Sequence, residues 1–542
     1  MFIKFKGVSY FILALILHFS ITPSATAATT IMSASVTGTK KFAPGNPNPP
    51  NPSSQKSPHQ TLDNVTDYLS SQENGGFQRF AGGFAVPEKP NLAELIGESE
   101  IQVLAKIDRQ FVKNLTETQV MDEEFARSTK ETNLSESIHA GRSFNRESLA
   151  ALARTEQAKA KTGQAYALLL PSVTINVSRG YETSDPSSII DKTTGELVST
   201  DTHTRTDVAF TVRQPLYDLP SFLDWRRREV LEQASGENYR ASDGDAYISI
   251  VNAYLFLVSS RLQADITRDF ETQLAELLNY IEKRAKAGAA SISDMARVRA
   301  RIEETLSSLL EQESAHATAG IEFVRLTNLV PDKVLLPVLE DVGASVVEKS
   351  FNMAVSTAIK SNPEIAALTA ELQAAKIDKS AAKGRYLPRV DAEFTDIYAK
   401  GAGGDTASQR DQRIMMVLNW NLFSGGKDYK YTVERTARHK ELQYLLDDQR
   451  RRVVQSLSAN YTALATTKGR ITSGYQELKA IATAAEAMSK RMLSGNQSLL
   501  DLLDVYDRFF QARSRLVSLH IQEMTTVAQL VRLTRGTPWE ES

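Results

Sequence analysis

Apolar residues recur every three or four positions over long stretches of the chain, the spacing that places side chains on one face of an α-helix. The longest such stripe consists of Tyr247, Val251, Tyr254, Val258, Leu262, Ile266, Phe270, Leu274, Leu277 and Ile281. It predicts one helix over about 221–284, and about 64 residues at 1.5 Å each would extend about 96 Å. A helix of this length needs partners along its whole length, so we expect a coiled-coil-like tube or stalk.

Between the helical stretches, apolar and polar residues alternate one by one, which is typical of a strand with one apolar face. The alternation predicts four strands, over about 173–182, 206–217, 390–398 and 412–423. Tilted strands of about this length are long enough to cross a bilayer. The links within the two strand pairs are long and polar, as the outer loops of a membrane barrel would be.

The whole pattern occurs twice along the chain. Leu170-Pro171 precedes the first strand of one copy, and Leu387-Pro388 precedes the first strand of the other. Each copy also has a tight turn between two long helices, with a helix-ending glycine, Gly288 or Gly495, followed by a serine that can cap the next helix. We therefore expect a duplicated unit of helix, strand, strand, long helix, turn and helix.

The first 133 residues differ from the repeats. Lys4 and Lys6, an apolar run over 8–19 and small residues at 25–27 follow the order of a secretory signal. The next stretch is rich in Pro, Asn and Gly and cannot bury enough apolar surface to fold. The expected divisions are a signal peptide at 1–27, a disordered tether at 28–90, a helical segment of unknown role at 91–133, the first repeat at 134–340, the second repeat at 341–536 and a C-terminal tail at 537–542.

Composition argues against several classes of function. The 542 residues carry 63 Lys+Arg against 65 Asp+Glu, a balance that does not favour nucleic-acid binding. Cysteine is absent, which excludes a disulfide framework, a thiolate metal site and a catalytic thiol. The motifs of zinc proteases, serine hydrolases and P-loop proteins are absent as well, so we expect no enzyme, no catalytic residues, no cofactor and no metal.

No later stretch offers 18 consecutive apolar residues, so after export the chain is either soluble or crosses a membrane by strands. Four strands cannot close a barrel, and an open sheet edge is not tolerated in lipid. Eight strands form the smallest common membrane barrel. The chain must therefore oligomerise if its strands lie in a membrane.

The repeated order of elements, with Leu-Pro before the first strand and Asn421-Leu422-Phe423-Ser424-Gly425-Gly426 after the fourth, resembles the TolC-like outer-membrane factors over about 134–536. The resemblance implies a mixed fold, in which a homotrimer completes a 12-stranded β-barrel in outer-membrane lipid and long helices form a periplasmic tube. Such channels export substrates together with a periplasmic adaptor and an inner-membrane transporter of the ABC or RND type. The segment 419–426 is most similar to the branch that serves type I protein secretion, ahead of multidrug efflux.

The resemblance extends to single residues at the turns. Asp501 and Asp504 match an Asp-x-x-Asp that forms carboxylate rings at the narrow periplasmic entrance of the family, where such rings favour cations. Asp294 and Ser293 match an acid and a hydroxyl that help to hold the entrance shut. Each also has an ordinary alternative: the first pair are acids favoured near a helix N-terminus, and the second belong to a capped helix start, with Ser291 or Ser293 as the cap.

Gly288 and Gly495 match turns that contact the adaptor, and their alternative role is helix termination. The chain departs from the family at two positions of the entrance network. Gln497 stands where the family has an Arg, and Met492 stands where it has a Tyr. A charge-based latch through these two positions is therefore not expected.

A different class of protein also has long helical hairpins, namely a periplasmic coiled-coil adaptor or scaffold that does not enter the outer membrane. Adaptors carry one hairpin flanked by compact β domains. This chain has two hairpins, each preceded by a strand pair, which favours the channel. The strand pairs also argue against a third possibility, a helical surface stalk.

Overall fold

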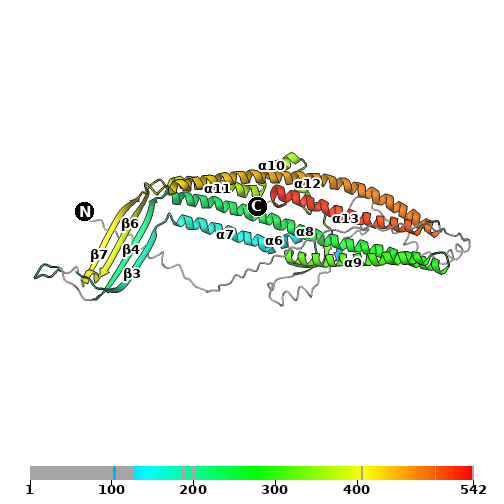
Figure 1. Ribbon diagram of the computed structural model, residues 1–542, viewed down its shortest axis with the longest axis horizontal. Helices are drawn as coiled ribbons and strands as arrows, with labels where there is room; N and C mark the ends of the chain where they lie inside the picture. The colour runs from blue at the N-terminus through cyan, green and yellow to red at the C-terminus, as the bar shows by residue number, and fades with distance from the viewer. Residues whose placement is uncertain are drawn as a thin grey trace, which may run out of the picture. The chain divides into compact units, whose positions relative to one another are not determined.

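The computed structural model describes residues 102–104, 127–185, 190–196, 202–404, 407–494 and 496–539. All of them belong to one compact unit, Leu62–Ser542 (Figure 1). The expected signal peptide and tether lie outside the described residues, as do Gly495 and most of the 91–133 segment.

Two copies of one element order make up the described chain (Figure 1). The first copy contains α6 (Leu134–Phe144), α7 (Arg146–Ala167), β3 (Ser172–Glu182), β4 (His203–Tyr217), α8 (Leu219–Lys286) and α9 (Ile292–Thr327). The second contains α10 (Phe351–Ser361), α11 (Pro363–Gly384), β6 (Arg389–Lys400), β7 (Ser408–Asn419), α12 (Lys427–Leu493) and α13 (Leu499–Arg535). Between the copies lie β5 (Leu329–Leu335) and the short 3₁₀ turn η1 (Ala344–Val346), and the turn η2 (Ala402–Gly404) joins β6 to β7.

The helix α8 runs without a break because its apolar stripe faces the core along most of its length. Every residue of the stripe predicted from the sequence is at most 3% exposed. Asp218 caps the start of the helix: its carboxylate accepts a hydrogen bond from the backbone N–H of Ser221 at 3.1 Å. Within the described ranges, no helix is both long enough and apolar enough to cross a membrane.

The four long strands form one antiparallel sheet in the order β3-β4-β6-β7. Their register places Val173 opposite Val212, Val212 opposite Phe394, and Phe394 opposite Ile414, so one face carries a row of apolar side chains. At the outer strands this face is bare: Val173 is 60% exposed and Ile414 is 81% exposed. A row of apolar side chains that the chain itself leaves exposed marks a surface that contacts another molecule or a membrane.

The fourth strand ends earlier than the sequence predicts. β7 stops at Asn419, which pairs with Arg389, the first residue of β6. Pro388 precedes that residue and has no backbone N–H to continue the ladder. The predicted strand residues 420–423 therefore lie beyond the sheet, in the segment that leads through two left-handed glycines, Gly425 and Gly426, into α12.

A second, three-stranded sheet corrects the helical prediction for 91–133. β1 (Gln102–Leu104) pairs antiparallel with β5, and β2 (Arg127–Thr132) pairs with it in parallel. In these parts the prediction was wrong, since β5 offers backbone groups that need partners and such pairing overrides a local helical period. The sequence of β2 is polar throughout and carries no apolar stripe.

In both copies a single asparagine breaks the helix that precedes the strands. The side chain of Asn145 accepts hydrogen bonds from the first backbone N–H groups of α7. Asn362 does the same for α11, and its amide also donates to the carbonyl of Leu533 at 2.9 Å. The C-terminus of α13 thus meets the N-terminus of α11 end to end, and one asparagine is bonded to both.

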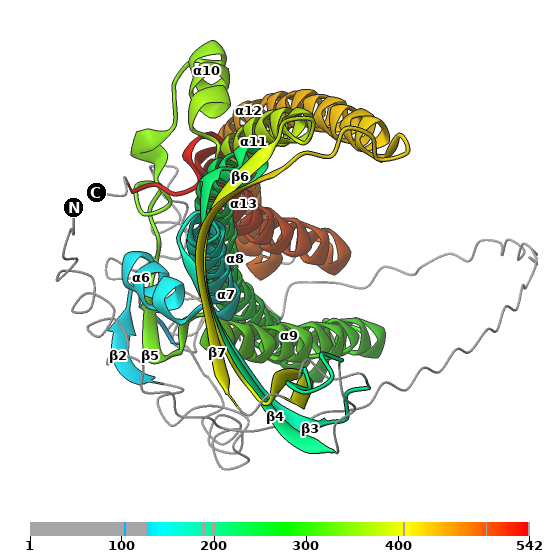
Figure 2. The ribbon, with the colours of Figure 1, turned by 90° about the vertical axis from the view of Figure 1, so that its left-hand side faces the viewer.

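The helices form a layer in which α8 packs between α7 and α9 on one side and α11 and α13 on the other. α12 packs against α11 and α13 and closes one side of this layer, while α9 lies on the opposite side (Figure 2). The sheet has the same order, because β3 follows α7 and β7 precedes α12. One edge of the unit is therefore β3, α7 and α9, and the other is β7 and α12.

Candidate functional site

The turn between α8 and α9 ends one helix in a Schellman motif. The backbone N–H of Gly288 donates to the carbonyl of Ala285 at 3.0 Å, and that of Ala289 donates to Arg284 at 2.8 Å. Gly288 has a φ of 75°, which favours glycine, and a Cβ there would meet open space. Helix termination alone accounts for this glycine within the chain, and its surroundings leave room for a partner.

The next residues start α9 with a capping box. Ser291 is the cap: its hydroxyl accepts from the backbone N–H of Ser293 at 3.1 Å, and the carboxylate of Asp294 accepts from the N–H of Ser291 at 3.3 Å. Arg297 lies 3.8 Å from the other oxygen of Asp294. Among the described residues, neither Ser293 nor Asp294 is bonded to α13, so these two residues do not join the turn before α9 to the turn before α13.

The acidic residues of the second turn lie exposed on the first turns of α13. Gln497 donates to the carboxylate of Asp501 at 3.1 Å. Asp504, whose side chain is 59% exposed, pairs with Arg508 at 2.9 Å. Gln497, which the resemblance places where the family has an Arg, therefore bonds within its own turn.

A third carboxylate, which the sequence reasoning missed, links the two hairpins. Asp507 accepts from Arg301 of α9, with the guanidinium Nε 2.9 Å and Nη2 2.7 Å from Oδ1. Burial raises the pKa of Asp507, and the charge of Arg301 opposes that shift. The spacing Asp501-x-x-Asp504-x-x-Asp507 was the signal, because residues three apart lie on neighbouring positions of one helix face.

Deeper in the same region, a neutral contact joins the hairpins. The hydroxyl of Tyr280 on α8 donates to the carbonyl of Met492 on α12 at 2.9 Å. Burial raises the pKa of Tyr280, so the phenol remains a donor. The side chain of Met492 is 4% exposed and packs in the core. Met492, which the resemblance places where the family has a Tyr, thus contributes packing and a carbonyl.

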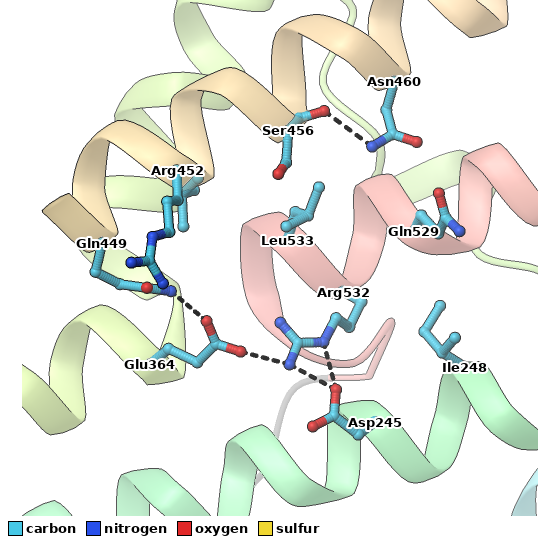
Figure 3. Close-up of a pocket in the computed structure, with 11 residues that line it drawn as sticks. Asp245, Ile248, Glu364, Gln449, Arg452, Ser456, Asn460, Gln529, Arg532 and Leu533 are labelled. Carbon is cyan, nitrogen blue, oxygen red and sulfur yellow. Dashed lines mark hydrogen bonds and ion pairs between the residues drawn. The ribbon is translucent and has the colours of Figure 1, made fainter. Parts of the chain in front are cut away.

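A cavity of about 390 Å³ lies where α11 meets α13, between α8 and α12 (Figure 3). Arg532 of α13 reaches Glu364 of α11 at 2.6 Å and Asp245 of α8 at 2.8 Å, and Gln449 of α12 donates to Glu364 at 2.5 Å. Arg532 is 14% exposed. The guanidinium therefore joins three helices, and Glu364 links them to a fourth through Gln449. Since the charge of Arg532 is already paired, the cavity is better explained as a helix joint than as a ligand site. The described residues contain no group of three or more His, Cys, Asp or Glu side chains able to hold a metal ion.

Comparison with known proteins gives consistent results in sequence and structure. A family model described as "Outer membrane efflux protein" matches residues 142–329 and 354–535, which fall in the two repeats. The alkaline protease secretion protein AprF of Pseudomonas aeruginosa is 22% identical over 369 residues, covering 67% of this chain and 76% of AprF.

Solved outer-membrane channels share the fold. VceC of Vibrio cholerae has a TM-score of 0.64 at 15% identity, covering 74% of this chain and 96% of VceC. The channel CmeC of Campylobacter jejuni has a TM-score of 0.61 at 15% identity, covering 83% and 93%. At such identities the likeness shows the fold alone, whereas the family model matches most of the chain. The chain belongs to the outer membrane efflux protein family, whose members are TolC-like transport proteins of the outer membrane.

Proposed function

We propose that three copies of the chain form one channel-tunnel. Their twelve strands close a β-barrel in the outer membrane, and their helices form a tube in the periplasm. The channel exports substrates that an inner-membrane transporter delivers through a periplasmic adaptor. Family membership disfavours the alternative of a periplasmic adaptor, which would not lie in the outer membrane.

The two different edges of the unit carry this proposal. β3 and β7 each pair with one neighbour, so each has a free edge within the described chain. An unpaired strand edge is not tolerated in lipid. Because the two edges are different surfaces, copies join head to tail, and such contacts form a ring when the rotation from one copy to the next closes. The bare apolar side chains of β3 and β7 supply the lipid-facing surface.

Type I protein secretion is the favoured pathway. AprF carries protein secretion in its name, and the similarity to it spans about two thirds of this chain. The test is complementation of a strain that lacks the outer-membrane component of a type I system. Secreted protease in the medium is the expected result. Restored drug resistance without secretion would assign the chain to multidrug efflux instead.

The acidic turn supplies the gate of this channel in our proposal. Asp501 and Asp504 are exposed, and each of the three chains would contribute both of them, so a ring would gather their charge around one axis. Asp294 and Ser293 lie at the start of α9 beside the same end of the tube, and the turns at Gly288 and Gly495 are the surfaces offered to an adaptor.

Ion conductance of the purified protein in a planar bilayer tests both the channel and the assignment of its gate. Wild type is compared with D501N/D504N and with D447N/D448N, a control that removes the same charge from α12, where the two acids pair with arginines on their own helix. We expect discrete channels whose cation preference falls in the first variant and not in the control. Channels indifferent to both changes would remove the gate assignment. A wild type that forms no channels and is absent from the outer membrane would overturn the function.

A further inference from the structure

The internal repeat produces one interface within the chain and leaves its counterpart open. Within the chain, α8 of the first repeat packs against α11 and α13 of the second repeat. By repeat, α12 is the counterpart of α8, and α7 and α9 are the counterparts of α11 and α13. The side of α12 away from α11 and α13, and the sides of α7 and α9 away from α8, meet no other long helix of the described chain.

The ends of the helices show which residue of the first repeat corresponds to which residue of the second. α8 ends at Lys286 and α12 at Leu493, which gives an offset of 207 residues for the long helices. The helices α9 and α13 start at Ile292 and Leu499, which gives the same offset. The helices α7 and α11 start at Arg146 and Pro363 and differ by 217 residues. Since the helices are continuous, an offset fixed at the turns holds along their length, and the starts of α8 and α12, Leu219 and Lys427, agree with it to within one residue.

Burial supports the correspondence. Leu310 on α9 is 67% exposed, whereas its counterpart on α13, Val517, is 0% exposed. Ile321 is 38% exposed, and its counterpart Ala528 is 0% exposed. At these two positions, a residue that α13 buries within the chain has an exposed apolar counterpart on α9. Large apolar side chains left exposed on a long helix call for a covering partner.

Charge identifies that partner. Within the chain, Gln263 of α8 donates to the carbonyl of Ser514 at 2.9 Å and reaches the hydroxyl of Ser518 on α13 at 3.4 Å. The counterpart of Gln263 is Arg470 on α12, and the counterpart of Ser518 is Glu311 on α9. Both are exposed, and the described residues provide neither with an ion pair. A neutral contact inside the chain thus has oppositely charged counterparts on its two open faces.

A second pair, closer to the strands, also places opposite charges on the two open faces. Arg227 of α8 lies 3.9 Å from Asp378 of α11. Their counterparts are Glu434 on α12 and Lys161 on α7, which reverses the sign of both charges. Glu434 is 64% exposed and Lys161 is exposed as well. The reversal discriminates between the two interfaces, because Arg227 facing Lys161 would be repelled.

We propose that α12 of one copy packs against α7 and α9 of the next in the way that α8 packs against α11 and α13 within the chain, with Arg470 opposite Glu311 and Glu434 opposite Lys161. The partner is a second copy of this chain, bound head to tail. The inference rests on the proposed trimer and specifies the register and the charge pairs of its helical interface. The same packing then recurs at every step around the tube.

The absence of cysteine from the sequence makes cross-linking a direct test. The variant R470C/E311C, treated with a short bismaleimide in detergent, should give covalent dimers and trimers on a denaturing gel. The matched control is R470C/E313C. Glu313 lies two residues further along α9 and pairs with Arg268 of its own α8 at 2.8 Å, so it faces away from the proposed interface. Equal cross-linking of the two variants would overturn the register.

Charge reversal provides the second measurement. R470E should raise the concentration needed for half-assembly by roughly tenfold, since each of the three interfaces loses an ion pair and gains a repulsion. The double variant R470E/E311R should restore assembly to the wild-type range. A double variant no better than R470E would refute the pairing, while a wild type that is monomeric in detergent would refute the trimer itself. The two failures are therefore distinguishable.

Discussion

Replacing Arg142 by methionine removes the charge that balances a buried carboxylate. Asp243 lies on α8 with its side chain 3% exposed. Arg142 of α6 binds both of its oxygens, with Nε 2.9 Å from Oδ1 and Nη2 2.6 Å from Oδ2. Methionine keeps much of the length of the side chain, so the substitution chiefly leaves Asp243 without its cation.

The expected cost differs between the two partners because their burial differs. Removing one partner of a buried pair costs about 3–5 kcal/mol, and the 23% exposure of Arg142 places R142M near the lower end of that range. D243N keeps an oxygen acceptor and leaves a guanidinium that water can reach, so its cost is about 1 kcal/mol. The double variant R142M/D243N contains no buried charge and should be less destabilised than the sum of the single variants.

Trp539 offers a local probe for the measurement. The guanidinium of Arg142 lies 4.2 Å from the centre of its ring, and Tyr247 packs edge-on against it. In a background that replaces the chain's other two tryptophans by phenylalanine, its fluorescence reports urea unfolding of the detergent-solubilised protein. If R142M costs no more than D243N, or less than about 1 kcal/mol, the carboxylate does not depend on Arg142 and the reasoning fails.

Two further predictions concern pH and the glycines of α8. Burial lowers the pKa of His520 below its ordinary value of 6.5, so the unfolded chain binds a proton at a higher pH than the folded chain, and stability falls as pH drops through 6.5. H520Q should therefore flatten the decline in melting temperature between about pH 7 and pH 5. A slope unchanged by H520Q would contradict this. G244A should destabilise by at least about 2 kcal/mol, because the new Cβ would lie 2.8 Å from the carbonyl oxygen of Gly536. G236A, with open space around it in the same helix, should stabilise by about 1 kcal/mol in thermal unfolding, and equal effects of the two changes would refute the close approach.

Features with a long period were predictable from the sequence. The stripe of α8 is buried at every predicted position because one apolar face repeated over many turns leaves a helix little choice of orientation. The alternation in the strand pairs likewise fixed which side chains share a face, since a strand has a period of two. The turn at Gly288 was predictable because few residues other than glycine tolerate its backbone.

Features that depend on a distant partner were not predictable. β1 and β2 become strands through β5, which lies about two hundred residues further along the chain. At the candidate site, the Asp501 and Asp504 spacing indicated one helix face, but the link from Asp507 to Arg301 requires α9 and α13 to pack on the same helix, α8. The joint at Arg532 combines four helices and has no local signature in the sequence.

The end-to-end meeting of α13 and α11 at Asn362 also bears on the order in which the chain can fold. The amide of Asn362 and the carbonyl of Leu533 that it binds are 171 residues apart. A chain that emerges from its N-terminus exposes the start of α11 long before the last turn of α13 exists, so a contact of such sequence separation forms late. Until the final residues arrive, the start of α11 lacks the carbonyl of Leu533 and the guanidinium of Arg532, so the joint at Arg532 closes only when the chain is complete.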